Sequence, residues 1–209
     1  MTPSVPRPAA TACVVRDGRS GIEVLLAKRS NGSPFVPGAS VFPGGGVDDT
    51  DRRAPDPFKA AAIRETFEEV GLLLADRVGS PVDPGRLLAE QRSVEDFAYD
   101  DVVYLSRWVT PERSGIRFDT RFYLAAAPAG SVLRIDDREL ISAGWFEPAR
   151  ALRSWAGGEL QMVSPTVAHL RYLDHYGTVD VALQGAIVGR FAGEIDQDAD
   201  IRRRQAGPA

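Results

Sequence analysis

The chain has 209 residues, 44% of them hydrophobic and 26% charged, with a formal net charge of −4 and a single cysteine. This length is enough for one well-buried core, so we expect one domain. The excess of acidic side chains disfavours nucleic acid as a partner, because binding a phosphate backbone needs a basic face. The apolar runs are too short to span a membrane and the start lacks a secretion pattern, so we expect a cytoplasmic protein without a membrane partner.

In chain order, the sequence predicts two strands and a helix, then further strands with helices between and after them. Strands are indicated where branched and aromatic residues lie between turn residues, at residues 9–18, 22–30, 41–42, 72–75, 104–112, 120–128 and 139–148. Helices are indicated by apolar spacing with proline or serine at the start and glycine at the end, at residues 56–71, 84–97, 149–158 and 164–177. This order predicts an α/β fold with a mixed sheet and flanking helices.

The domain boundaries follow from composition. We expect residues 1–8 to form a proline-rich lead and residues 9–177 to form the domain. Residues 178–209 are expected to be a C-terminal extension, in part a flexible tail, because an acidic run followed by a basic run is typical of solvated chain ends.

The helix predicted at residues 56–71 carries Glu65, Glu68 and Glu69 on the side opposite its apolar stripe. Carboxylates at this spacing repel each other by about 0.2–0.5 kcal/mol per exposed pair. Two interpretations stay open: a solvated acidic face on which Arg64 pairs with Glu68, or a group that holds a cation. Three glycines before the helix favour the second, because such a backbone approaches a ligand closely and carboxylates suit Mg²⁺ or Mn²⁺.

Gly45, Asp56 and the run RETFEEVGL at residues 64–72 resemble the Nudix box, G-x5-E-x7-R-E-U-x-E-E-x-G-U, in which U is a bulky apolar residue. The second half agrees at every constrained position except the first U, where this chain has Thr66. Six fixed residues at fixed spacing are a specific signal. The resemblance implies an α/β/α sandwich with a mixed sheet.

The first half of the box departs from the pattern. Ten residues, 46–55, stand where the box has five, and Asp56 occupies the position of its first glutamate. Asp51 lies at the right distance from Gly45 but at the wrong distance from Arg64. Two interpretations of residues 47–55 stay open: a solvated bulge without a role, or a segment that contacts the substrate.

The resemblance also implies a chemistry. Nudix enzymes hydrolyse a phosphoanhydride in a nucleoside diphosphate derivative with Mg²⁺ or Mn²⁺ as cofactor. By this likeness Glu65, Glu68 and Glu69 are the expected metal-binding residues, and Arg64 orients their carboxylates. Glu65 is the first choice for the base that takes a proton from water, and Glu139 is the alternative.

A second resemblance concerns the substrate. Residues 25–45, LLAKRSNGSPFVPGASVFPGG, are similar to the motif LLTxR(S/A)xxxRxxxGxxxFPGG of coenzyme A diphosphatases. The second arginine of that motif, a natural phosphate partner, is replaced by Pro34. Arg29, Gly44 and Gly45 are the expected substrate-binding residues.

These likenesses favour cleavage of coenzyme A or acyl-coenzyme A into phosphopantetheine and adenosine 3',5'-bisphosphate. Two alternatives stay open: a pyrophosphatase for ADP-ribose, dinucleotides or nucleoside triphosphates, and a Nudix fold that binds a ligand without catalysis. A homodimer is also left open, because Nudix relatives are often dimers.

Overall fold

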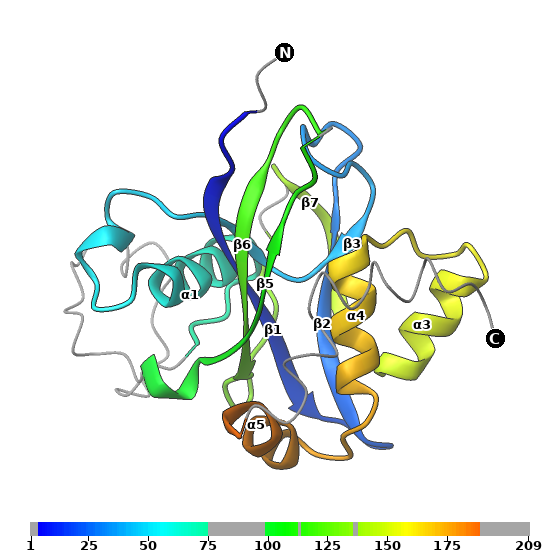
Figure 1. Cartoon of the computed structure of the whole chain (residues 1–209). Coiled ribbons are helices and arrows are strands. Elements are labelled where there is room, and N and C mark those ends of the chain that lie inside the picture. Colours follow the sequence, from blue (N-terminus) through cyan, green and yellow to red (C-terminus); the bar gives the residue numbers. More distant parts are fainter. Residues whose placement is uncertain (1–3, 75–98, 113, 136–137, 189–209) are drawn as a thin grey trace.

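A seven-stranded mixed sheet forms the centre of the molecule (Figure 1). The computed structural model describes residues 4–74, 99–112, 114–135 and 138–188. The strands are β1 (Arg7–Asp17), β2 (Ile22–Arg29), β3 (Ser40–Val41), β4 (Gly44–Gly46), β5 (Val103–Val109), β6 (Phe118–Ala126) and β7 (Leu140–Phe146). The helices are α1 (Pro57–Val70), α3 (Pro148–Ala156), α4 (Ser164–Leu173) and α5 (Val179–Ile187), with the 3-10 turns η1 (Asp51–Arg53) and η3 (Tyr99–Asp101).

The strand pairing brings distant parts of the chain together. The main path is β3-β2-β1-β6-β5, with β4 paired to β1 and β7 paired to β2. β1 and β6 run parallel, in register from Arg7 opposite Phe118 to Val15 opposite Ala126, and the other pairs are antiparallel. Strands β4 and β7 therefore approach the same central pair from different points in the sequence.

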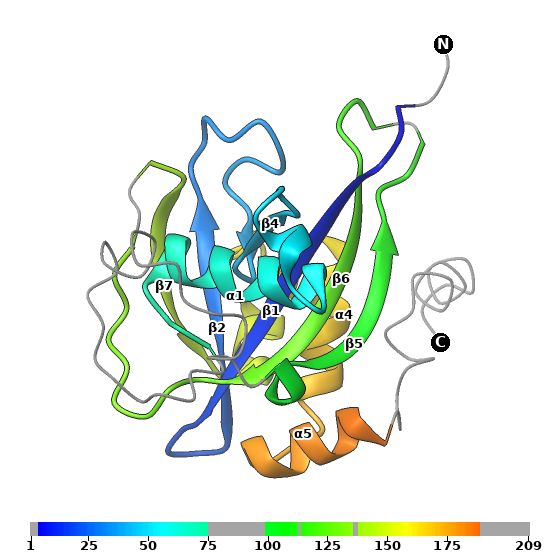
Figure 2. The ribbon, with the colours of Figure 1, turned by 90° about the vertical axis from the view of Figure 1, so that its left-hand side faces the viewer.

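The two faces of the sheet are covered by different helices. On β1, Ala12 and Val14 belong to the core shared with α1, whereas Cys13 and Val15 belong to the core shared with α3, α4 and α5. This alternation follows from the two-residue period of a strand. Figure 2 shows α1 in front of the sheet and α4 behind it. The expected α/β/α sandwich with a mixed sheet is confirmed.

Most predicted elements form close to their expected positions. The expected helix at residues 84–97 lies outside the described residues, as do residues 189–209. The first strand begins at Arg7, two residues before the expected start of the domain. None of the helices in the described part of the chain is long and apolar enough to span a membrane.

Three segments differ from expectation. Residues 72–74 form no strand, although Leu72 and Leu74 are buried, because they pack into the core beyond the end of α1. The three glycines before α1 form the strand β4, of which the sequence carried no signal, since they pair with β1. The segment after Thr178 begins as the helix α5, in which Val179 and Ala182 are buried against the sheet.

Candidate active site

The helix α1 has a defined start and end. Asp56 is its N-cap, and the Asp56 carboxylate accepts hydrogen bonds from the backbone amides of Phe58 (3.0 Å) and Lys59 (3.2 Å). Pro57 occupies the first turn, where its missing N–H costs nothing. Gly71 ends the helix at φ 73°, a conformation that favours glycine. The residue at the position of the first box glutamate therefore caps the helix.

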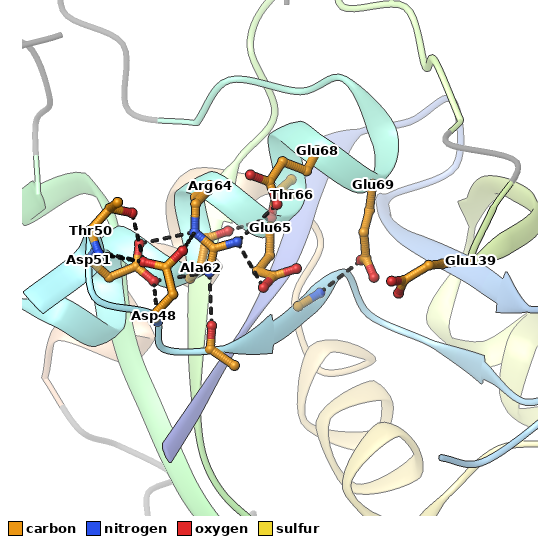
Figure 3. Close-up of polar contacts among 12 residues, drawn as sticks. Asp48, Thr50, Asp51, Ala62, Arg64, Glu65, Thr66, Glu68, Glu69 and Glu139 are labelled. Carbon is orange, nitrogen blue, oxygen red and sulfur yellow. Dashed lines mark hydrogen bonds and ion pairs between the residues drawn. The ribbon is translucent and has the colours of Figure 1, made fainter. Parts of the chain in front are cut away.

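Arg64 lies at the centre of an ion-pair network on α1 (Figure 3). Its Nε and Nη2 donate to the two carboxylate oxygens of Asp51 at 3.1 and 3.0 Å, and Nη2 also donates to the Gly46 carbonyl at 2.8 Å. Its Nη1 lies 2.9 Å from both Glu65 and Glu68. Burial by itself lowers the pKa of Arg64, but the hydrogen bond to Asp51 and the surrounding carboxylates outweigh it and raise the pKa.

The segment at residues 47–55 holds this network in place. Asp51 is only 4% exposed, and its carboxylate also accepts from the Asp48 amide at 2.9 Å. Asp48 in turn accepts from the amides of Thr50 (2.8 Å) and Asp51 (2.9 Å). The segment therefore presents one buried carboxylate, that of Asp51, to Arg64, although most of its other side chains are exposed. In the sequence, the spacing from Gly45 pointed to Asp51 as the first acid of the box. The spacing from Arg64 pointed to a different aspartate, so the sequence alone did not decide between them.

Glu69 and Glu65 lie against the backbone of β4. Glu69 is 6% exposed and accepts from the Gly44 amide at 3.0 Å. Burial raises the pKa of Glu69 to about 8, and the charges of Glu65 and Glu139 act in the same direction. The Glu65 carboxylate covers Gly45 so closely that a Cβ at Gly45 would come within 2.5 Å of it. The glycine at this position makes room for the acid.

Two further expected residues reach the same place from another part of the sheet. Arg29 ends β2 and Glu139 directly precedes β7, which pairs with β2. Arg29 Nη2 lies 3.8 Å from Glu139, and Arg29 Nε donates to the Ser33 hydroxyl at 2.9 Å. Figure 3 shows Glu69 and Glu139 pointing toward each other. Sheet pairing thus brings Glu139 to the carboxylates of α1.

Comparison with known proteins identifies the family. The sequence profile of the NUDIX domain matches residues 6–164, more than half of the chain. The chain belongs to the NUDIX family. A NUDIX hydrolase from Alicyclobacillus acidocaldarius has a similar structure, with 31% identity, a TM-score of 0.76, and coverage of 87% of this chain and 96% of that chain.

Curated NUDIX relatives are similar over a shorter share of their own length. A Caenorhabditis elegans protein named as a nudix hydrolase is 30% identical over 162 residues, which cover 72% of this chain and 55% of that protein. An acyl-coenzyme A diphosphatase from Xenopus laevis is 26% identical, with coverage of 79% of this chain and 63% of that protein. The chain therefore spans about three-fifths of the length of these relatives.

The acidic side chains of this NUDIX site suit a divalent cation by their chemistry, because carboxylate oxygens are the ligands that hard cations prefer. Burial raises the pKa of Glu65 as well as that of Glu69, and a bound cation offsets both effects. Among the described residues, no three acidic, histidine or cysteine side chains already surround one point. Glu65 and Glu68 each contact Arg64 through one carboxylate oxygen, Oε1 of Glu65 and Oε2 of Glu68.

Proposed function

We propose that this chain is a divalent-metal-dependent hydrolase that cleaves a phosphoanhydride, with coenzyme A or acyl-coenzyme A as the favoured substrate. One observation carries the proposal. Glu65, Glu68 and Glu69 share one face of α1, Glu65 and Glu69 lie against the backbone of Gly45 and Gly44, and Glu69 faces a fourth acid, Glu139. Such a concentration of acids is unfavourable without a cation and suits one that is shared with phosphate oxygens.

The residues of the site are proposed to have different roles, according to where each one lies. Glu65, Glu68 and Glu69 are proposed to hold Mg²⁺ or Mn²⁺, which neutralises the charge that develops on the phosphates and makes water more acidic. Arg29, whose side chain is 16% exposed and contacts Ser33 and Glu139, is proposed to bind a substrate phosphate.

The glycine backbone completes the proposed site. The Gly44 amide already donates to Glu69, and Gly45 leaves space for the Glu65 carboxylate. Gly44 and Gly45 are therefore proposed to form the backbone surface against which the cation and the diphosphate bind.

Two acids are candidates for the base. Glu65 is largely buried, and burial raises its pKa, which brings proton uptake closer to neutral pH. Glu139 has a 64% exposed side chain and, within the described part of the chain, a 3.8 Å contact to Arg29, so it has room to reorient toward a water molecule. Glu65 is one of the acids of α1, and Glu139 points toward another of them, Glu69. Kinetic measurements on variants must therefore assign the proton transfer.

The choice of substrate rests on relatives and on the segment around Arg29. Acyl-coenzyme A diphosphatases from Xenopus laevis and Homo sapiens are each 26% identical to this chain. The Arg29 side chain, which belongs to the motif shared with coenzyme A diphosphatases, lies beside Glu139 and near Glu69. ADP-ribose, dinucleotides and nucleoside triphosphates remain the alternative substrates.

A substrate panel tests the proposal. The full chain is incubated with Mg²⁺ or Mn²⁺ and each of coenzyme A, an acyl-coenzyme A, ADP-ribose, a dinucleotide and a nucleoside triphosphate, and products are identified by mass. We expect phosphopantetheine and adenosine 3',5'-bisphosphate as the main products. Faster cleavage of ADP-ribose than of coenzyme A would reject the substrate assignment, and binding without turnover of any compound would indicate a ligand-binding module.

A matched pair of variants tests the metal assignment. Glu68→Gln removes a proposed ligand and is expected to abolish metal-dependent hydrolysis while circular dichroism stays unchanged. Glu23→Gln makes the same substitution in a surface ion pair with Arg16 on the sheet, where little effect is expected. Normal hydrolysis by Glu68→Gln would show that the metal assignment is wrong.

A further inference from the structure

A series of hydrogen bonds lies in the core between the sheet and α4, on the face opposite α1. The Trp108 indole nitrogen lies 3.2 Å from the Ser106 hydroxyl, which lies 2.8 Å from His169 Nε2. His169 Nδ1 lies 2.7 Å from the Pro165 carbonyl. Ser106 is 5% exposed and His169 is fully buried. The strand β5 and the helix α4 are thus joined through one imidazole ring.

The partners of His169 determine its protonation state. A carbonyl only accepts, so Nδ1 carries the proton and donates to Pro165. Burial lowers the pKa of His169 to about 4, so the ring is neutral and Nε2 accepts from the Ser106 hydroxyl. The Ser106 oxygen then accepts from Trp108. Because both ring nitrogens are bonded, the ring cannot rotate without the loss of a buried hydrogen bond.

Two phenylalanines pack against this fixed ring. Phe122 of β6 stacks on His169 with the ring centroids 4.4 Å apart. Phe42, between β3 and β4, meets the His169 ring edge to face, at 6.0 Å between centroids and 86° between planes. Phe42 is only 3% exposed. Since buried rings in a close-packed core cannot move independently, the place of His169 limits where the chain at Phe42 can lie.

The chain crosses from one face of the sheet to the other within two residues of Phe42. The Phe42 side chain belongs to the core on the α4 side, whereas the Gly44 amide donates to Glu69 of α1 at 3.0 Å. The Pro43 carbonyl, in the same peptide unit as that amide, accepts from the Ala12 amide at 3.0 Å. A peptide unit is planar, so a tilt of the chain at Phe42 would move both bonds.

We propose that His169 is a positioning residue for the candidate active site, because it holds Phe42 and thereby keeps the Gly44 amide where it binds Glu69. This inference goes beyond the proposed function, which assigns no role to α4. The Gly44–Glu69 bond forms without a cation, so its dependence on His169 can be tested apart from hydrolysis.

Nuclear magnetic resonance of the full chain, without cation or substrate, reports on the Gly44 amide. A bond to a carboxylate moves an amide proton signal downfield, and Glu69→Ala supplies the position of the unbonded signal. His169→Phe keeps an aromatic ring but neither hydrogen bond, and we expect the Gly44 signal to move toward the Glu69→Ala position. Val179→Ala is the matched control, since it removes a buried side chain of α5, away from β3 (Figure 1), and should leave the signal in place.

Mn²⁺ affinity, measured by titration calorimetry without substrate, tests the consequence for the site. We expect His169→Phe to bind Mn²⁺ about 10-fold more weakly than the wild type, as is typical when an outer partner of a metal ligand is lost. Val179→Ala should bind Mn²⁺ as the wild type does. In Phe42→Leu the contact to His169 is already lost, so adding His169→Phe should weaken Mn²⁺ binding little further.

An unmoved Gly44 signal in His169→Phe overturns the proposal, and so does wild-type Mn²⁺ affinity in that variant or an equal loss of affinity in Val179→Ala. If His169→Phe fails to fold, Ser106→Ala, which removes the bond to Nε2 but keeps the ring, is measured with the same criteria. A wild type that binds no Mn²⁺ would reject the metal-dependent function, whereas the Gly44 signal would still decide whether His169 positions that amide.

Discussion

At the scale of single residues, Glu69 is the most perturbed acid of the site. Its pKa is raised from 4.5 to about 8, mainly by burial. The folded state therefore binds more protons than the unfolded state between these two values, and this contribution to stability is lost as pH rises through that range. In the absence of a cation, the ionised carboxylate of Glu69 destabilises the fold at alkaline pH.

Replacing this carboxylate with a neutral group tests that electrostatic cost. With chelator present, Glu69→Gln should raise the free energy of unfolding at pH 8.5 by at least about 1 kcal/mol, since one pKa unit corresponds to about 1.4 kcal/mol. The side-chain carbonyl oxygen of the variant can still accept from the Gly44 amide, so the packing is kept. Urea denaturation at pH 5 and pH 8.5 measures the effect, which should shrink at pH 5. A variant less stable than the wild type at pH 8.5 would contradict it.

The base can be assigned by comparing two variants of the same kind. Glu65→Gln and Glu139→Gln each remove one candidate, and we expect a loss of kcat of about 10²–10⁴-fold for the true base. The deciding measurement is kcat at saturating Mn²⁺, because saturation compensates for a weakened metal site but not for a lost base. Glu65 is expected to lose metal affinity as well, since it is a proposed ligand. If both variants retained full turnover, neither acid would be the base.

At the scale of elements, the strand β4 provides the backbone against which acidic side chains of α1 pack. A Cβ at Gly45 would collide with the Glu65 carboxylate, whereas a Cβ at Gly46 would meet nothing within 4 Å. Gly45→Ala is therefore expected to displace Glu65 and lower turnover by up to about 10²-fold, the effect of a small misplacement of a reacting group. Gly46→Ala is the matched control, and equal turnover of the two variants would contradict the role of Gly45.

The helix α5, the first part of the C-terminal extension, packs against the sheet. The Val179 amide donates to Asp17 at 2.9 Å, and the Val179 side chain is 7% exposed, whereas that of Val181 is 56% exposed. Val179→Ala should lower the free energy of unfolding by about 1–3 kcal/mol, and Val181→Ala should change it by less than about 0.5 kcal/mol. Chemical denaturation of both variants measures the difference, and equal stabilities would argue against docking of α5.

At the scale of the whole molecule, stability and cation binding should be linked. A ligand that binds only the folded state stabilises it by about 2.7 kcal/mol at a concentration 100 times its Kd. The Tm of the full chain should therefore rise with Mn²⁺ concentration, and much less so in Glu68→Gln. A calorimetric scan with chelator as the zero point measures this shift. An equal rise in Tm for both proteins would place the cation elsewhere.

Much of this fold can be predicted from local patterns. The helix α1 is recognised from Asp56, Pro57 and Gly71, because caps and breakers act within a few residues. The strand β4 and the helix α5 are not recognised, for different reasons. Three glycines have little intrinsic preference for a strand, so β4 depends on its pairing with β1. The helix α5 is short, and its stability comes from packing on the sheet.

The sequence by itself determined that Glu65, Glu68 and Glu69 lie on one side of α1, because helical periodicity alone places them there. Only the tertiary structure decided which acid binds Arg64 and which acid faces Glu69. Asp51 reaches Arg64 through the fold of a loop, and Glu139 reaches Glu69 through the pairing of β7 with β2. The position of Glu139 beside Glu69 depends on the pairing of strands far apart in the chain, which patterns of a few neighbouring residues do not specify.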